Sequence, residues 1–187
     1  HTLNVTDIHT TWTESVAILG KAQVRVSEGL DTIRRELPFE LVGIDSDNGS
    51  EFINDHLVRY CKRDAIQFTR GRPYKKDDNA HIEQKNWTHV RRLVGYLRYD
   101  SPRALAAMNG LYREDLRVLQ NLFLPSVKLM RKTRVGSRLR RHYDPPRTAL
   151  DRLLSCPGHK AARLSALRAL RERLDPFRLS TTIDRKL

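Results

Sequence analysis

Hydrophobic and polar positions along the first part of the chain predict a β-hairpin followed by a helix. Residues 2–8 alternate between apolar and polar side chains, and residues 12–20 form a second such run after the turn sequence HTT. Apolar residues then recur at helical spacing over residues 21–37, where Pro38 ends the helix because it cannot donate a backbone hydrogen bond.

The next segment repeats the order of strand and helix. A strand over residues 40–45, a helix over 51–63 and a short strand over 65–69 precede a basic loop over 70–80 that contains Gly and Pro. A long helix is then expected from about residue 80 to about residue 97. Its buried stripe would consist of Ile82, Val90, Leu93, Val94 and Leu97. The order predicts an α/β layer with a mixed sheet flanked by helices.

The second half of the chain predicts a smaller region of helices and one hairpin. A helix is expected from Pro102 to about residue 123, and two basic strands over 127–143 flank Gly136, where alternation would turn Leu139 inward. A last helix carries leucines that would pack on the core or on a second subunit, namely Leu164, Leu167, Leu170 and Leu174. We therefore divide the chain into a core, 1–110, and a basic C-terminal region, 111–187.

Charge is distributed unevenly between these regions. Residues 1–100 contain 15 basic and 15 acidic side chains, whereas residues 101–187 contain 20 basic and 7 acidic ones, so the whole net charge of +13 lies in the second half. This asymmetry favours an anionic polymer as partner. Heparin-like or lipid surfaces, or a basic surface without any partner, would also satisfy the charge.

Two further features of the composition indicate the cellular compartment of the protein. The sequence has no run of about 18 apolar residues, so no membrane span or membrane partner is predicted. Cys61 and Cys156 lie far apart without a second cysteine nearby, which disfavours a disulfide framework and fits a reducing, cytoplasmic setting.

The stretch GIDSDNGSEF, residues 43–52, contains the first candidate for chemistry. Asn-Gly alone indicates a turn, but Asp47 also leaves the carboxyl end of a predicted central strand, where open α/β sheets place their ligands. Glu83 lies in the first turn of the long helix, with 35 residues between it and Asp47. Two carboxylates on rigid elements can share a hard cation such as Mg²⁺, and paired metals assist phosphodiester chemistry. A helix glutamate alone would be explained by the helix dipole.

The combination of motif and spacing carries a resemblance to a known family. DNGSEF with a helix glutamate 35 residues on resembles the D,D-35-E signature of retroviral integrases and insertion-sequence transposases. The segment FTRGRPYKKDDNAHIEQKNWTHVRRLVGY is similar to integrase cores of bacterial insertion sequences. The resemblance covers about residues 2–100, and NLFLPSVKLMRKTRVGSRLRRHYD also resembles the downstream region of that subgroup.

The resemblance implies an RNase H-like fold and a DDE polynucleotidyl transferase that cleaves and joins DNA with Mg²⁺ or Mn²⁺. It implies double-stranded DNA, both element ends and target, as partner, a homo-oligomer on that DNA, and a bacterial, nucleoid-associated location. It selects Asp47 over Asp45, which lies two residues too early for the spacing to Glu83. Lys85, His89 and Arg92, at spacings of 4 and 3, would form a basic stripe along the long helix. Together with this stripe, the basic loop and the basic strands, the resemblance gives these DNA-contacting candidates: Arg72, Lys75, Lys76, Lys85, His89, Arg92, Arg138, Arg140 and Arg141.

One element of the family pattern is not found where it is expected. Such sites use three carboxylates, the first on the opening strand, and Asp7 is the candidate in this sequence. We assign Asp7 to the turn instead, because only two of the three expected strands fit before residue 21, so that the first strand and its Asp would lie upstream of His1. The chain as given is then expected to be inactive, which leaves two readings: a catalytic-core fragment, or an inactive DNA-binding remnant of a transposase. A different RNase H-like nuclease is disfavoured by the 35-residue gap and the basic tail.

Overall fold

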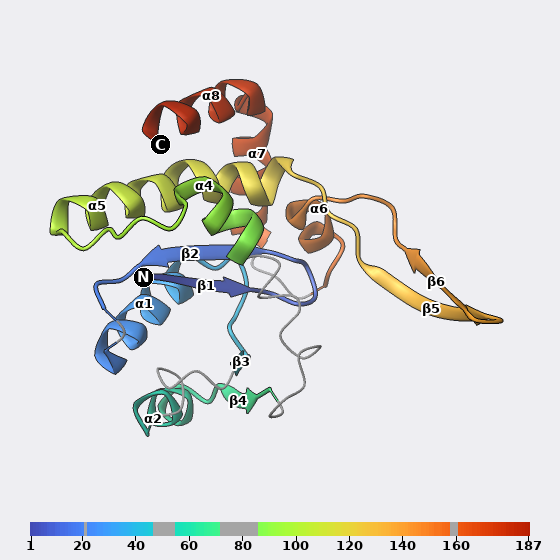
Figure 1. Cartoon of the computed structure of the whole chain (residues 1–187), viewed down its shortest axis with the longest axis horizontal. Coiled ribbons are helices and arrows are strands. Elements are labelled where there is room, and N and C mark those ends of the chain that lie inside the picture. The colour runs from blue at the N-terminus through green and yellow to red at the C-terminus, as the bar shows by residue number, and fades with distance from the viewer. Residues whose placement is uncertain (21, 47–54, 72–85, 158–160) are drawn as a thin grey trace.

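The computed structural model describes residues 1–20, 22–46, 55–71, 86–157 and 161–187, and it is a mixed α/β protein (Figure 1). Its strands are β1 Thr2–Thr6, β2 Thr13–Ala17, β3 Gly43–Ser46, β4 Gln67–Arg70, β5 Leu129–Val135 and β6 Arg138–Tyr143. Its α-helices are α1 Gln23–Glu36, α2 Asp55–Arg63, α4 Arg92–Val94, α5 Pro102–Gly110, α6 Ala149–Leu154, α7 Ala161–Arg173 and α8 Pro176–Lys186. The wider π-helical segments are η2 Asn86–Arg91, η3 Leu111–Leu116 and η4 Leu119–Phe123.

The predicted N-terminal hairpin is confirmed. Strands β1 and β2 pair antiparallel, from Thr2 opposite Ala17 to Thr6 opposite Thr13. Asp7 stabilises the turn, because its carboxylate accepts hydrogen bonds from the backbone N–H and the hydroxyl of Thr10, at 2.7 and 2.6 Å. This is the turn role that the sequence predicts for Asp7.

Helix α1 packs closely against this hairpin. Gly29 makes the approach possible, since a Cβ at this position would lie 3.1 to 3.2 Å from side-chain carbons of Leu3, Val16 and Ile18. The helix ends at Glu36, with Leu37 as its C-cap directly before Pro38, close to the predicted end. One core cluster joins this layer to the second half of the chain, with members that include Leu3, Trp12, Leu30, Ile33, Leu57, Val118, Leu122, Leu150 and Leu153.

Strands β3 and β4 form a second, parallel pair, from Gly43 opposite Gln67 to Ser46 opposite Arg70. The sequence predicted one mixed sheet, and this was wrong for the described residues, in which β1–β2 and β3–β4 are separate two-stranded sheets. Part of the reason is that a helix, and no strand, covers the outer edge of β2.

The predicted helix after Pro102 is confirmed and provides that cover. It runs from α5 through η3 to η4, with the Ser101 hydroxyl accepting from the backbone N–H of Ala104 at its start. Asn109 accepts from the N–H and donates to the C=O of Ala17, and Asn121 does the same with Thr13, at 2.8 to 3.1 Å. Two side-chain amides thus occupy the strand edge as a neighbouring strand would.

This helix also passes without a break through residue 110, where the sequence-based division places its boundary. Side chains from both sides of that position pack in the same core cluster. A truncation at residue 110 would therefore cut through a helix and expose apolar core surface.

The helix expected up to residue 97 ends earlier than predicted. Gly95 adopts φ +67°, a left-handed conformation that suits glycine and terminates helices. Val90 is buried as expected, but Leu97 lies beyond the end and is 77% exposed, so its assignment to the buried stripe was wrong. The residues from 80 to 85 lie outside the described part of the chain.

The hairpin and the last leucine-rich helix of the second half are both present. The four leucines of the predicted stripe are partly buried and pack against the main core cluster, which is one of the two positions predicted for them, core or second subunit. The hairpin β5–β6 differs from expectation in that every side chain of both strands is exposed. Leu139 is 49% exposed, so the prediction that it turns inward was wrong.

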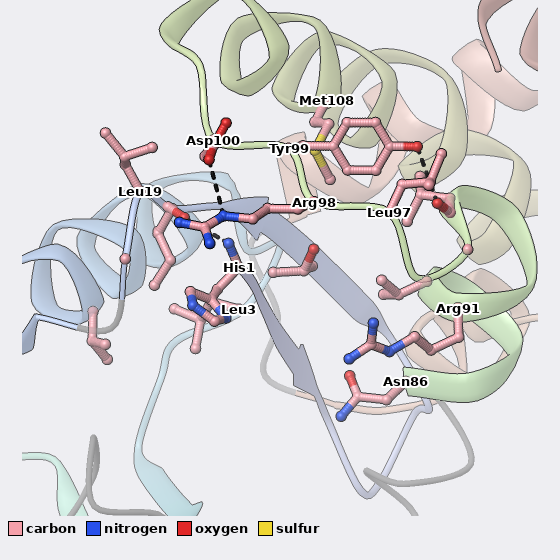
Figure 2. Close-up of a pocket in the computed structure, with 17 residues that line it drawn as sticks. His1, Leu3, Leu19, Asn86, Arg91, Leu97, Arg98, Tyr99, Asp100 and Met108 are labelled. Atoms are coloured by element: carbon pink, nitrogen blue, oxygen red, sulfur yellow. Dashed lines mark hydrogen bonds and ion pairs between the residues drawn. The ribbon is translucent and has the colours of Figure 1, made fainter.

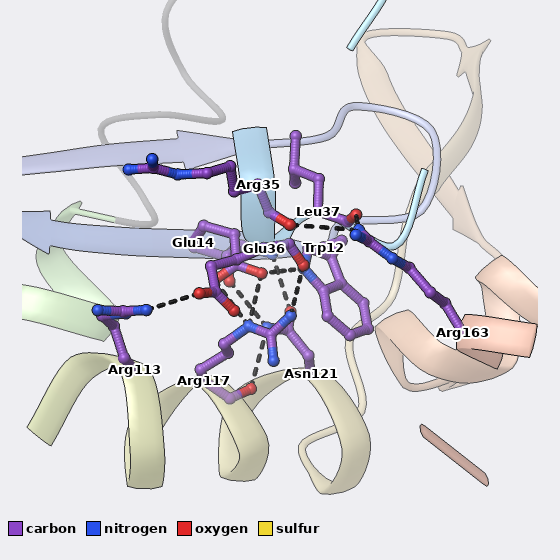
Figure 3. A network of polar contacts seen from close by, with 10 residues as sticks. Trp12, Glu14, Arg35, Glu36, Leu37, Arg113, Arg117, Asn121 and Arg163 are labelled. Carbon is purple, nitrogen blue, oxygen red and sulfur yellow. Dashed lines mark hydrogen bonds and ion pairs between the residues drawn. The ribbon is translucent and has the colours of Figure 1, made fainter. Parts of the chain in front are cut away.

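A buried ion pair ties the N-terminal hairpin to the long helix (Figure 3). The Arg117 Nε donates to both carboxylate oxygens of Glu14 at 2.7 and 2.9 Å, and its Nη2 donates to the C=O of Glu36 at 2.8 Å. The Trp12 indole N–H donates to the same carboxylate at 2.7 Å. Burial raises the pKa of Glu14, while the neighbouring Arg117 opposes this effect.

Candidate functional site

The two predicted metal ligands, Asp47 and Glu83, lie outside the described residues, so their predicted proximity stays a prediction. The structure does describe the strand ends that lead to this region. Because β3 and β4 are parallel, their carboxyl ends lie at the same edge, where the Gly71 N–H donates to the Ser46 C=O at 2.9 Å. Asp47 and Arg72 are the next residues in the sequence.

The rejected alternative Asp45 is engaged within the strand pair. Its carboxylate accepts a hydrogen bond from the Thr69 hydroxyl, its cross-strand neighbour, at 2.6 Å. The buried Ser46 hydroxyl, by contrast, has no hydrogen-bond partner among the described residues. Carboxylate oxygens are the ligands that Mg²⁺ and Mn²⁺ prefer, so an Asp that follows this strand end in the sequence has a residue type that suits either ion.

The long helix that the sequence predicts around Glu83 is described from Asn86 onward. Its Asn86 side chain accepts from the Asn4 amide on β1 at 3.3 Å, and Asn4 in turn accepts from the Ser15 hydroxyl on β2 at 3.1 Å. The start of the described helix therefore lies on the N-terminal hairpin.

The DNA-contacting candidates fall into two groups. Arg92, Arg138, Arg140 and Arg141 are exposed, as a phosphate-contacting role requires. The remaining candidates lie outside the residues or side chains that the structure describes: Arg72, Lys75, Lys76, Lys85 and the imidazole of His89. The stripe of Lys85, His89 and Arg92 assumed α-helical spacing, whereas residues 86–91 form a wider π-helix.

A cavity of about 1000 Å³ lies beside this helix (Figure 2). It is bounded by β1, the start of α1, the helix from Asn86 to Val94 and the segment 95–100. Among the described residues of its lining, the one carboxylate is that of Asp100, which pairs with the Arg98 Nε at 2.9 Å. This described lining offers Arg91 and Arg98 but no pair of carboxylates for a metal.

More generally, no cluster of three or more His, Cys, Asp or Glu side chains suited to a metal occurs within the described residues. Over the same residues, the structure contains no helix with the length and apolar character needed to cross a membrane.

The sequence reasoning missed a set of contacts at the base of the β5–β6 hairpin. Asp144 accepts from the Lys128 N–H at 2.5 Å and from Arg152, which is buried on α6. These two donors, Arg152 first, lower the pKa of Asp144 to about 2. The sequence does contain a signal for this region. Thr148-x-x-Asp151 is a capping box, which indicates that a helix, α6, begins directly after Thr148.

Comparison with known proteins yields two kinds of similarity, and no protein-family model matches the chain. The uncharacterized protein y4rM of Sinorhizobium fredii is 44% identical over 145 residues, which is 78% of this chain and 41% of that protein. The chain thus spans about two fifths of the length of this curated relative.

Among solved structures, the catalytic core domain of BIV integrase gives a TM-score of 0.44 at 20% identity, covering 60% of this chain and 75% of that one. The simian T-cell lymphotropic virus intasome in complex with PP2A regulatory subunit B56 gamma gives 0.47 at 15% identity, covering 78% and 60%.

Proposed function

We propose that this chain is the catalytic-core part of a DDE transposase or integrase, which cleaves and joins double-stranded DNA with Mg²⁺ or Mn²⁺. The observation that supports this most is the position of Asp47. It follows directly on the carboxyl end of β3 in a parallel pair, with 35 residues between it and Glu83, within the DNGSEF motif. Parallel strand ends are where α/β sheets gather ligands from several loops.

In this proposal Asp47 and Glu83 hold the metal, which supplies positive charge to the phosphodiester when it is bound. Asp45 has a different role, because its hydrogen bond to Thr69 keeps its carboxylate on the strand pair. Arg72, Lys75 and Lys76 follow the end of β4 in the sequence and would neutralise phosphates near the site. The protein would act as a homo-oligomer on DNA.

The proposal includes a further strand, upstream of His1, that carries a third carboxylate. Within the described residues, β1 pairs only with β2 and β3 pairs only with β4, while asparagine side chains occupy the other edge of β2. One strand between β1 and β3 would join the two pairs into a single mixed sheet.

The test of the proposed function is DNA cleavage and strand transfer with Mg²⁺ or Mn²⁺. We expect residues 1–187 alone to show little or no metal-dependent nicking of a plasmid, because phosphoryl chemistry depends on the complete metal-binding charge. A polypeptide extended upstream through the proposed strand should cleave. Robust cleavage by residues 1–187 that is lost in Asp7→Asn would instead assign the third carboxylate to Asp7. An extended protein that binds DNA but never cleaves it would favour the alternative function, an inactive DNA-binding remnant.

The basic second half gives a separate prediction about affinity. If a third to a half of the net +13 contacts phosphates, the slope of log K against log salt should be on the order of −4 to −6, at about −0.9 per neutralised phosphate. The measurement is the affinity of residues 1–187 for duplex DNA between about 50 and 200 mM salt. A slope between zero and −1 would contradict a role for this surface in DNA binding.

A further inference from the structure

The β5–β6 hairpin projects away from the rest of the molecule as a two-stranded ribbon (Figure 1). Both strands are exposed along their whole length, and Gly136 makes the turn between them with φ +61°. A two-stranded hairpin without a buried face gains little stability from packing in water. Packing on the described part of the protein therefore does not explain which residue types the β5–β6 hairpin contains.

The ribbon contains only one sign of charge. Residues 127–143 include seven Lys and Arg side chains and no Asp or Glu. One of the seven, Lys128, is used at the base, where its ammonium group donates to the C=O groups of Ile8 and His9 at 3.0 and 2.8 Å. The other six lie along the exposed strands.

These six cations are divided equally between the two faces of the ribbon. Residues that stand opposite each other in an antiparallel pair share a face, and successive residues alternate. The observed register therefore places Arg131, Arg138 and Arg140 on one face. It places Lys132, Arg134 and Arg141 on the other.

A flat polyanionic surface would be contacted by only one face of such a ribbon. Cations on both faces match a partner that surrounds the ribbon with negative charge on two sides, as the two phosphate walls of a DNA groove do. The major groove of B-DNA, about 12 Å wide, admits a two-stranded β-ribbon, whereas the minor groove is only about 6 Å wide. The major groove of A-form RNA is too narrow for side chains to read.

The tip of the ribbon also exposes apolar side chains between its cations. Val135 is 53% exposed and Leu139 is 49% exposed, on opposite faces of the ribbon according to the register. Apolar side chains in the major groove contact the methyl group of thymine. A surface whose only role is to keep the protein soluble would not need exposed apolar side chains.

The base of the ribbon is fixed to the body of the protein. Asp144 binds the Lys128 N–H and Arg152, and Arg152 also donates to the Ser126 C=O at 2.8 Å. A backbone bridge joins Ser126 and Arg147 at 2.9 and 3.1 Å. The ribbon therefore leaves the body in a defined direction instead of forming a loose basic tail.

We infer that the β5–β6 ribbon enters the major groove of duplex DNA and that its two faces neutralise phosphates on opposite walls of the groove. This rests on the proposed function only for the choice of DNA as partner. Binding by the ribbon needs neither metal nor cleavage, so it can fail or succeed independently of the catalytic proposal.

The first test compares three variants of the full chain with equal changes in charge. One replaces Arg131, Arg138 and Arg140 with Gln, and the second replaces Lys132, Arg134 and Arg141 with Gln. The control replaces Arg168, Arg173 and Arg185, which are exposed on α7 and α8, with Gln. Binding is measured by fluorescence anisotropy with a labelled DNA duplex of about 30 bp, roughly three helical turns.

Each face variant should bind more than about tenfold more weakly at about 0.1 M salt, with a slope of log K against log salt that is shallower by about 2 to 3. The control should change affinity less than about threefold, and all three proteins should keep the thermal midpoint of the parent because the replaced side chains are exposed. A large effect for only one face would show that the ribbon lies flat on DNA, and equal effects for all three variants would show that charge alone decides binding. Either result would overturn the inference.

The second test identifies the groove. Methylation of guanine N7 in the major groove should weaken binding of the parent protein, whereas a minor-groove ligand such as netropsin should compete little. A duplex RNA of the same sequence should compete at least about tenfold more weakly than the DNA, because its major groove excludes the ribbon. Competition by netropsin without an effect of methylation, or equal competition by RNA, would contradict major-groove binding.

Discussion

Replacing Arg117 with Met is expected to lower the free energy of unfolding by about 3–5 kcal/mol, the usual effect of removing one partner from a buried ion pair. Arg117 is the cation that pairs with the Glu14 carboxylate, which is buried between β2 and the long helix (Figure 3). Met retains the apolar stem but leaves Glu14 charged and without its cation. Urea unfolding of the parent and the variant, followed by circular dichroism, measures the difference.

The pH dependence of this effect has a defined sign. Burial already raises the pKa of Glu14, and loss of Arg117 should raise this pKa further. A carboxyl whose pKa is raised in the folded state favours folding at low pH, and this contribution disappears as pH rises through the folded pKa. The Arg117→Met variant should therefore regain part of its lost stability when pH is lowered from about 7.5 to about 5.5, whereas the parent should change less.

Two companion variants separate the buried pair from a general effect of charge. Adding Glu14→Gln to Arg117→Met removes the unpaired charge and keeps an acceptor for the Trp12 indole N–H, so much of the stability should return. Arg113→Met breaks the exposed pair with Glu36, 2.6 Å long, and should cost less than about 1 kcal/mol. A loss for Arg117→Met no larger than that for Arg113→Met would refute the assignment of Glu14 and Arg117 as a buried structural pair.

Local sequence patterns were sufficient to predict most elements of this fold. The hairpin β1–β2, helix α1 and the helix after Pro102 each combine clear periodicity with a turn or capping residue at the end, such as Asp7, Pro38 and Ser101. The leucine stripe over residues 164–174 likewise predicted the face that packs against the core, where these leucines are partly buried. In these segments local preference and tertiary packing favour the same structure.

The sheet arrangement could not be predicted in the same way. Whether β2 has a strand or a helix at its outer edge depends on Asn109 and Asn121, more than 90 residues away in sequence. Nothing in local periodicity distinguishes an asparagine on a helix surface from one that binds a strand edge. Leu97 was misplaced because an apolar residue in helical phase was given more weight than Gly95 two residues earlier.

The ribbon shows a different limit of sequence reasoning. Alternation in a strand predicts which side chains share a face, and this was correct for Arg138 and Arg140. It does not predict that either face is buried. Burial of Leu139 was assumed because one face of a strand usually packs on a core, whereas β5–β6 has no core beneath it.

The candidate site was predicted from the DNGSEF motif and its spacing to Glu83. It is tested by replacing its carboxylates and measuring the loss of catalysis. In a polypeptide extended upstream of His1 that cleaves DNA, Asp47→Asn and Glu83→Gln should each reduce metal-dependent cleavage and strand transfer by at least about 10²–10³-fold. Each removes one carboxylate from the set that we propose to hold the metal, and loss of a single preorganised electrostatic contact has effects of this size. Initial rates on a labelled duplex in Mg²⁺ and in Mn²⁺ provide the measurement.

Asp45→Asn is the matched control, because Asp45 lies on the same strand two residues earlier and its carboxylate is bound to the Thr69 hydroxyl. It removes the same charge from the same strand end but should leave cleavage within about threefold of the parent. DNA affinity measured without metal should be similar for all three variants, because the cations that bind phosphates are unchanged. Cleavage that survives in Asp47→Asn and is lost in Asp45→Asn would transfer the metal-binding role to Asp45. It would also show that the 35-residue spacing between Asp47 and Glu83 does not define the site.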